Sequence, residues 1–265
     1  MTAAYVTLVT NDDYALGALA LARSLKRVDS DHSLCVMVTR EDLALAPLEA
    51  EGCKVIRVER LPCSKAFNKR HTRERQHAAA PFTKGTKPAF HDPLDNFCKL
   101  RLWELETYER VVFIDADAIV VRDIRKLFSY PEFSAAPNLY ETLADMHRLN
   151  SGVFVARPSK RTFENMLLAL DQPNVFWRRT DQTFLESYFP DWHGLPYTYN
   201  ALQYIYFNLP DLWRWSSIRV VHYQYEKPWE TNHPKLAQLR PLIDLWHAVL
   251  EGGDLPEELP PLVMQ

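Results

Sequence analysis

Two aspartates one residue apart are the first residues in this sequence whose spacing could do chemistry. Asp115 and Asp117 follow the apolar run 111–114, which is typical of a strand buried in a parallel sheet. Alternate side chains of a strand point the same way, so we expect both carboxylates at the carboxyl end of the sheet, where open α/β folds bind ligands. Such hard oxygen anions suit Mg²⁺ or Mn²⁺ holding a diphosphate. The alternative is a solvated strand end with two unrelated aspartates.

A histidine at the end of a second apolar run is the next candidate ligand. His222 lies in the run 219–223 and is followed by Lys227 and Trp229. An imidazole beside two carboxylates makes a mixed nitrogen and oxygen site, which favours Mn²⁺ over Mg²⁺ because Mg²⁺ resists giving up oxygen ligands. The alternative is a strand histidine that hydrogen-bonds to the backbone.

The elements that must position these residues alternate between strand-like and helical patterns, which predicts an α/β fold. The expected strands cover residues 4–10, 33–39, 54–59, 111–114, 151–157 and 219–223. The expected helices cover residues 14–28, 41–50, a stretch after Asp95, 160–170 behind a Ser159 cap, and 181–188.

We expect one domain over residues 1–230 and a helical extension with a tail over 231–265. Residues 62–93 show no periodicity and carry seven Lys and Arg residues with few acids, which predicts a long basic loop. Such loops are usually lids, binding loops or disordered segments, and we expect a lid over the donor diphosphate. Apolar residues spaced three or four apart over 236–250 predict a C-terminal helix docked on the body, kinked at Pro241.

Composition excludes several classes of protein. The formal net charge of −3 is too balanced for a general nucleic-acid binder. The 7 glycines form neither the dinucleotide fingerprint nor a P-loop. Four widely spaced cysteines predict reduced structural thiols. The start of the chain lacks a basic leader and its apolar runs are too short for a membrane span, so we expect a cytoplasmic protein.

Several sequence blocks, taken in order, resemble glycosyltransferase family 8, the family that includes glycogenin and the galactinol synthases. The blocks are TLVTNDDYALGALALARSL (7–25), NFCKLRLWEL (96–105), VVFIDADAIVV (111–121), LNSGVFV (149–155), TDQTFL (180–185) and VVHYQYEKPW (220–229). One departure is visible: family members usually carry a glycine between the histidine and K-P-W, where this chain has Gln224-Tyr225-Glu226.

The resemblance implies a GT-A fold, a Rossmann-like and mostly parallel sheet flanked by helices in a single domain. It assigns donor binding to Leu8, Thr10, Asn11, Tyr14, Lys99, Asp115, Ala116, Asn150, Ser151, Gly152 and Lys227. It assigns the metal to Asp115, Asp117 and His222, and catalysis to Asp181 and Gln182. Simpler interpretations are core packing for Leu8, a solvated helix lysine for Lys99, a turn for residues 150–152 and a helix N-cap for Asp181.

The activity implied is retaining transfer of a hexose from a UDP-sugar to a hydroxyl acceptor, with Mn²⁺, or Mg²⁺ as the second candidate. We prefer a front-face reaction to a covalent intermediate on Asp181, since no carboxylate pair of the retaining-hydrolase type is evident. The acceptor is a polyol or a saccharide, as for galactinol synthases, or a tyrosine of the protein itself, which would be Tyr206. Two competing hypotheses are a nucleotidyltransferase and a catalytically inactive binding module. No nucleic acid is expected as a partner, and a homodimer is left open.

Overall fold

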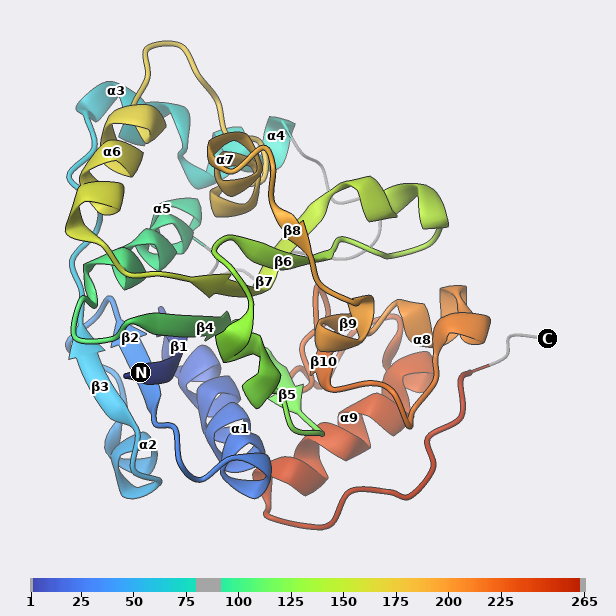
Figure 1. Cartoon of the computed structure of the whole chain (residues 1–265). Coiled ribbons are helices and arrows are strands. Elements are labelled where there is room, and N and C mark those ends of the chain that lie inside the picture. The colour runs from blue at the N-terminus through green and yellow to red at the C-terminus, as the bar shows by residue number, and fades with distance from the viewer. Residues whose placement is uncertain (1, 80–91, 263–265) are drawn as a thin grey trace.

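The structure, a computed structural model, describes residues 2–79 and 92–262. Its centre is a seven-stranded sheet in the order β3-β2-β1-β4-β7-β6-β8 (Figure 1). These strands are β1 (Ala3–Val9), β2 (Leu34–Val38), β3 (Lys54–Arg57), β4 (Arg110–Ile114), β6 (Ser134–Pro137), β7 (Leu149–Ala156) and β8 (His193–Gly194). Helices lie on both sides of the sheet, so the expected GT-A type architecture is confirmed.

The sheet is mostly parallel, as expected, with one strand reversed at its centre. β1 pairs in parallel with β2 and with β4, and β2 pairs in parallel with β3. β7 runs antiparallel to both β4 and β6, with Ile114 opposite Val153. β7 therefore begins beside the carboxyl end of β4, which brings the 150–152 segment next to Asp115.

Alternating side chains of the strands fill two cores, one on each face of the sheet. On one face Tyr5, Val36 and Val112 pack against helix α1 (Asp12–Val28). On the other face Val6, Met37 and Phe113 pack against the segments that follow β3 and β7. A strand buried on both faces has no polar side, which is why these runs read as continuous apolar sequence.

Within the described residues there are eight further α-helices and five 3-10 helices. The α-helices are α2 (Ala46–Ala50), α3 (Lys65–Arg70), α4 (Arg73–Ala79), α5 (Pro93–Asn96), α6 (Lys160–Leu170), α7 (Asp181–Tyr188), α8 (Ile205–Asn208) and α9 (Leu236–Leu250). The 3-10 helices are η1 (Phe97–Glu104), η2 (Arg125–Ser129), η3 (Leu143–His147), η4 (Tyr197–Tyr199) and η5 (Pro210–Leu212). The Ser159 cap of α6 is confirmed, since its hydroxyl accepts from the Thr162 N–H.

A second, three-stranded sheet holds the other half of the site. Its order is β5-β10-β9, formed by β5 (Ala118–Val120), β10 (Val220–His222) and β9 (Ala201–Leu202). Behind it lies α9, whose Trp246 is fully buried in a core shared with β10. The predicted C-terminal helix is therefore packed against the body, and it continues through Pro241.

The prediction of a long irregular loop over residues 62–93 is wrong for much of its length. Residues 65–70 and 73–79 form α3 and α4, and Phe67 and His71 are buried. The His71 ring is bonded at both nitrogens, to the Phe67 carbonyl and the Trp177 N–H. The missing periodicity reflects helices of one or two turns, which are too short to show a repeat. Lys84, Lys87 and the rest of the expected lid between 80 and 91 lie outside the described residues.

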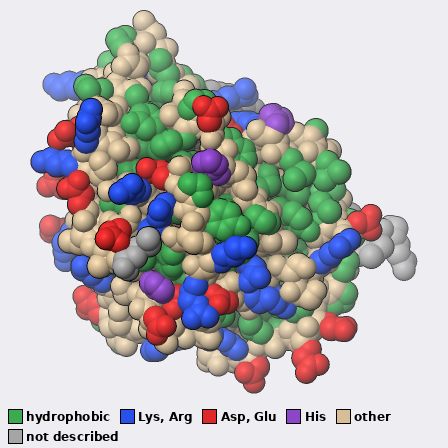
Figure 2. All heavy atoms as spheres, in the orientation of Figure 1, with side chains coloured by type: hydrophobic (Ala, Val, Ile, Leu, Met, Phe, Trp, Pro, Cys, Tyr) green, Lys and Arg blue, Asp and Glu red, His purple; other side chains and the backbone are tan. Residues whose placement is uncertain are grey.

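The cysteines and the surface charges are arranged as the composition predicts. All four cysteines are free, and burial raises the pKa of the Cys63 thiol to about 12 and that of Cys53 to about 11. Figure 2 shows positive and negative side chains interspersed over the face drawn, in keeping with the net charge of −3. Within residues 2–79 and 92–262 no helix combines the length and the apolar character that a membrane crossing requires.

Candidate active site

The two aspartates lie in a tight turn between β4 and β5. β4 ends at Ile114, and the Ala118 N–H donates to the Asp115 carbonyl at 3.1 Å. The expectation that strand alternation aligns the carboxylates is therefore wrong, although both do face one site. Their convergence is set by the turn, which is held by hydrogen bonds from the Asp115 N–H to the Gly152 carbonyl and from the Tyr223 N–H to the Asp117 carbonyl, both 2.8 Å.

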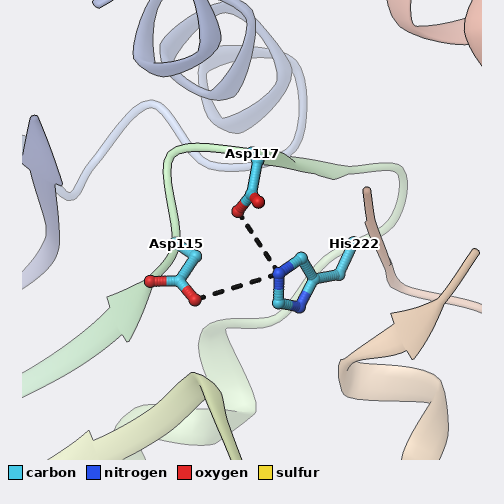
Figure 3. A group of neighbouring side chains, drawn as sticks. All are labelled: Asp115, Asp117 and His222. Carbon is cyan, nitrogen blue, oxygen red and sulfur yellow. Dashed lines mark ion pairs between the residues drawn. The ribbon is translucent and has the colours of Figure 1, made fainter. Parts of the chain in front are cut away.

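His222 completes a cluster with these carboxylates (Figure 3). Its Nε2 lies 3.2 Å from Asp117 Oδ1 and 3.8 Å from Asp115 Oδ2. One ligand atom from each of the three residues lies within 4.8 Å of the others. The β10 register explains this position, because His222 pairs with Ala118, the residue just after the turn.

Two lysines flank this cluster, one beside each aspartate. Lys99 Nζ lies 3.0 Å from Asp115 Oδ1, and Lys227 Nζ is bonded to Asp117 Oδ2. The second carboxylate oxygen of each aspartate faces His222. In each aspartate the lysine and the imidazole thus contact different oxygens. A metal ion could therefore bind the two oxygens that face His222 without displacing either lysine.

The charges in the site shift one another's pKa values. Burial lowers the pKa of Lys99, but Asp115 and Asp181 raise it more, so the amine stays charged. The same balance with Asp117 raises the pKa of Lys227. Burial raises the pKa of Asp117, but Lys227 and His222 together hold it well below its usual range. Asp117 is therefore an anion at neutral pH.

Asp115 differs from its partner. Burial is the main reason that its pKa is raised, and Lys99 only partly offsets this while Asp117 adds to it. Two carboxylates so close together repel each other when both are ionised, which a divalent cation would relieve. The site fits a metal of the Mn²⁺ or Mg²⁺ class, since it offers two carboxylate oxygens and one imidazole nitrogen.

Asp181 joins the same site from the first turn of α7. Its Oδ2 accepts from Lys99 Nζ at 2.9 Å and from Ser151 Oγ at 2.8 Å, and its Oδ1 accepts from Thr180 Oγ1 at 2.9 Å. The N-cap position belongs to Thr180, so the N-cap interpretation of Asp181 is wrong. Gln182 is buried beside it, at 7% exposure.

The 150–152 segment lies inside β7, so the interpretation of it as a turn is also wrong. Ser151 contributes its hydroxyl to Asp181 and its carbonyl to Lys99 Nζ. Gly152 packs against the His222 ring, and a Cβ built on it would lie 2.3 Å from His222 Cε1. Only glycine fits at this contact.

The N-terminal donor-binding candidates divide into two groups. Leu8 belongs to the core, at 9% exposure, whereas Thr10 and Asn11 are half-buried where β1 passes into α1. Asn11 is the N-cap of α1 and accepts from the Tyr14 N–H at 2.9 Å. The Tyr14 ring lies 5.9 Å from Lys227 Nζ, so it borders the charged cluster.

The structure shows site residues that the sequence analysis missed. Asn200 Oδ1 lies 2.9 Å from His222 Nδ1, and Asn138 is bonded to Asn150. Gly17 lets α1 approach the aspartate turn, since a Cβ there would lie 2.5 Å from the Ala116 carbonyl oxygen. Small and amide residues recur in every sequence, so only the spatial arrangement identifies these three as part of the site.

The structure also bears on the interpretations of Lys99 and Tyr206. Lys99 is 5% exposed on η1, so it is not a solvated helix lysine. Tyr206, the candidate self-glycosylation acceptor, is 3% exposed and packs edge-on against Trp213, with ring centroids 5.1 Å apart. Almost all of this side chain therefore lies within the core.

Comparison with known proteins identifies the family of the chain. Residues 5–233 match the model of a family described as glycosyl transferase family 8. The chain is 34% identical over 249 residues to glycogenin-1 of Homo sapiens, covering 89% of this chain and 65% of that protein. It is 33% identical over 237 residues to a protein of Arabidopsis thaliana named putative UDP-glucuronate:xylan alpha-glucuronosyltransferase 5, covering 85% of this chain and 36% of that protein. The chain thus spans from about a third to just under two thirds of these relatives.

Solved structures share the fold at low sequence identity. The glycosyltransferase GlyE of Streptococcus pneumoniae superposes with a TM-score of 0.62 at 17% identity, covering 94% of this chain and 62% of that one. The galactosyltransferase LgtC, in complex with donor and acceptor sugar analogues, superposes with a TM-score of 0.58 at 14% identity, covering 96% and 97%.

Proposed function

The chain belongs to glycosyl transferase family 8, and from this premise we propose that it transfers a hexosyl group from a UDP-sugar to a hydroxyl acceptor, with retention of anomeric configuration and with Mn²⁺. The observation that carries the proposal is the convergence of Asp115 Oδ2, Asp117 Oδ1 and His222 Nε2 between two buried lysines. Mg²⁺ is the second candidate metal.

The positive charges of the site suit a reaction in which a negatively charged diphosphate is the leaving group. Breaking the glycosidic bond leaves negative charge on UDP, and Mn²⁺ held by the cluster would stabilise that charge. Lys227 and Lys99 supply two further positive charges beside the same carboxylates. We assign Lys227 to the leaving phosphate, because it lies against Tyr14 at the start of α1, where Thr10 and Asn11 would receive the nucleoside.

The surroundings of Asp181 support the front-face reaction over a covalent intermediate. Both of its oxygens already accept hydrogen bonds, from Lys99, Ser151 and Thr180. A carboxylate bonded in this way is a weak nucleophile, because attack would break those bonds. In the front-face reaction Asp181 holds Lys99 in place, the Gln182 amide faces the reacting sugar carbon, and the leaving phosphate accepts the acceptor's proton.

We propose a polyol or saccharide as the acceptor. The burial of Tyr206 weighs against self-glycosylation of that residue, and family membership weighs against a nucleotidyltransferase. An inactive binding module is disfavoured because the metal ligands and both lysines are all assembled.

A donor screen tests the proposal. UDP release is measured with UDP-glucose, UDP-galactose, the UDP-N-acetylhexosamines and UDP-glucuronate, the last because one relative is named for that donor. We expect release from at least one donor with Mn²⁺, loss of release in EDTA, and loss in Asp117→Asn. Asp123→Asn, an exposed aspartate on the same segment, is the matched control and should keep activity. No release from any donor, or release unaffected by EDTA, would contradict the proposal.

Intact mass after the same incubation separates the acceptor classes. A polyol or saccharide acceptor leaves the mass of the protein unchanged. A ladder of added hexoses would mean that the chain is its own acceptor.

A further inference from the structure

The orientation of the metal-ligating histidine is set by a chain of buried amides. Asn138, Asn150 and Asn200 are linked in a row that ends at His222, and all four residues are at most 4% exposed. The side-chain amide of an asparagine can be placed in either of two orientations, because its oxygen and its NH₂ group are similar in size. Here the backbone N–H of Gly152 determines the orientation of the first amide.

The fixed point is the N–H of Gly152. It donates to Asn150 Oδ1 at 2.9 Å, and a backbone N–H is always a donor, so the atom it meets must be the amide oxygen. Asn150 Nδ2 then points the other way and donates to Asn138 Oδ1 at 2.9 Å. The orientation of Asn150 is therefore determined.

This orientation determines that of Asn200. Its Nδ2 lies 2.8 Å from Asn150 Oδ1, which is already known to be an acceptor, so Asn200 must present its NH₂ group there. The opposite orientation would place two oxygens at hydrogen-bonding distance with no proton between them. Asn200 Oδ1 consequently faces His222 Nδ1, at 2.9 Å.

An oxygen at this position requires a proton on His222 Nδ1. In the neutral ring the lone pair is then on Nε2, the atom that lies between Asp115 Oδ2 and Asp117 Oδ1. The bond to Asn200 also fixes the plane of the ring, which lies against the bare Cα of Gly152. Partners of this kind orient metal-bound histidines in general.

We propose that Asn200 is a positioning residue that holds His222 in the tautomer and orientation needed to bind the metal, and that Asn150, anchored on the Gly152 N–H, sets the direction of the Asn200 amide. The proposal rests on the proposed metal-dependent function. β9 and β10 pair in parallel, with Val221 opposite Ala201, which is why a residue so distant in sequence lies beside His222.

The test measures Mn²⁺ affinity directly, by electron paramagnetic resonance of free Mn²⁺ in the presence of saturating UDP. Asn200→Ala should bind Mn²⁺ about 10- to 100-fold more weakly than the wild type, the usual loss when such a partner is removed. Asn208→Ala is the matched control, because it removes a nearby partly buried amide that donates to the Tyr140 carbonyl and does not contact His222. It should bind Mn²⁺ like the wild type.

Two further variants separate positioning from a general structural role. Asn150→Ala removes the acceptor that sets the direction of the Asn200 amide, so it should also weaken Mn²⁺ binding, by no more than Asn200→Ala does. In a His222→Ala background, Asn200→Ala should change Mn²⁺ affinity less than twofold, because its effect acts through the ring. Thermal unfolding of each variant checks that the protein is folded.

The outcomes distinguish this inference from the function on which it rests. If the wild type itself does not bind Mn²⁺, the proposed metal site is wrong. If the wild type binds and Asn200→Ala binds equally well, the positioning role is wrong. An equal loss in the His222→Ala background, or wild-type Mn²⁺ binding by Asn150→Ala, would also overturn it.

Discussion

At the scale of single residues, the site is a set of charges that neutralise one another. Lys99 contacts both Asp115 and Asp181, while Lys227 contacts Asp117 and the Tyr223 carbonyl. Each lysine is at most 5% exposed, so removing its charge would leave carboxylates without compensation in a poorly solvated place.

Lys99→Met should therefore lower stability strongly. Methionine keeps most of the side-chain volume but removes the partner of two carboxylates, for which we expect a loss of about 3–5 kcal/mol in the free energy of unfolding. Urea unfolding measures it. The exposed Lys126→Met is the control and should change stability by less than about 0.5 kcal/mol. Equal stability of the two variants would show that Lys99 does not compensate these carboxylates.

Gly152→Ala should displace His222, the proposed metal ligand. The added Cβ would lie 2.3 Å from His222 Cε1, so the ring must move, which we expect to weaken Mn²⁺ activation about 10- to 100-fold and to cost about 1–3 kcal/mol of stability. Turnover over a range of Mn²⁺ concentrations measures the first effect and urea unfolding the second. Gly194→Ala is the control, because the nearest atom to its Cβ is 4.0 Å away. Unchanged Mn²⁺ activation would contradict the assigned position of His222.

At the scale of elements, the site depends on how closely α1 approaches the aspartate turn. Gly17 faces the Ala116 carbonyl and the Trp229 ring, so α1, the aspartate turn and the 220–229 block meet at one glycine. In an exposed helix interior, replacing glycine by alanine stabilises the protein by about 0.5–1 kcal/mol. At Gly17 the close contact with backbone opposes this gain.

Gly17→Ala should consequently destabilise the protein, by roughly 1–2 kcal/mol net, because overpacking costs about 1–3 kcal/mol and exceeds the gain in helix propensity. Urea unfolding supplies the measurement, with Leu16→Ala on an exposed part of the same helix as the control. A gain in stability would mean that the turn yields easily to the added methyl group.

Much of the element order could be predicted from the sequence, and the reasons for the misses are physical. The spacing of Phe97, Leu100 and Trp103 predicts a helix, and a three-residue repeat fits the observed 3-10 helix η1 better than an α-helix. β5, β9 and β8 were missed because runs of two or three residues carry no periodic signal. The reversed direction of β7 has no signature in its own residues.

Some residues of the candidate site could likewise be predicted from the sequence and others could not. The residues with distinctive chemistry, Asp115, Asp117 and His222, could be found from their types and from the resemblance to a family. The residues that orient them, Asn200 and Gly152 among them, act through contacts between segments far apart in sequence. Such contacts become visible only when the two sheets are assembled.

At the scale of the whole molecule, global stability should depend on acid through Asp29, which follows α1 and ties it to β1. Burial raises the pKa of Asp29, but hydrogen bonds from Tyr5, the Asp31 N–H and His32 lower it more, so the net pKa lies below its ordinary value of 3.8. The unfolded chain then binds more protons than the folded one at low pH, and stability rises with pH in that range.

Asp29→Asn should abolish this contribution. The wild type should be more stable than the variant by a constant amount above about pH 5, and the difference should shrink as the pH falls below the ordinary value of 3.8. Urea unfolding at pH 7, 5, 4 and 3 measures it, with the exposed Asp191→Asn as the control. A difference that stays constant down to pH 3 would contradict the lowered pKa.

The central claim, that the two sheets meet to form a metal-dependent UDP-sugar site, is tested most directly by calorimetric titration of UDP with and without Mn²⁺. We predict that Mn²⁺ tightens UDP binding at least about tenfold, that Asp117→Asn removes this gain, and that Asp123→Asn retains it. UDP binding that is equally tight in EDTA, or no UDP binding under either condition, would contradict the claim.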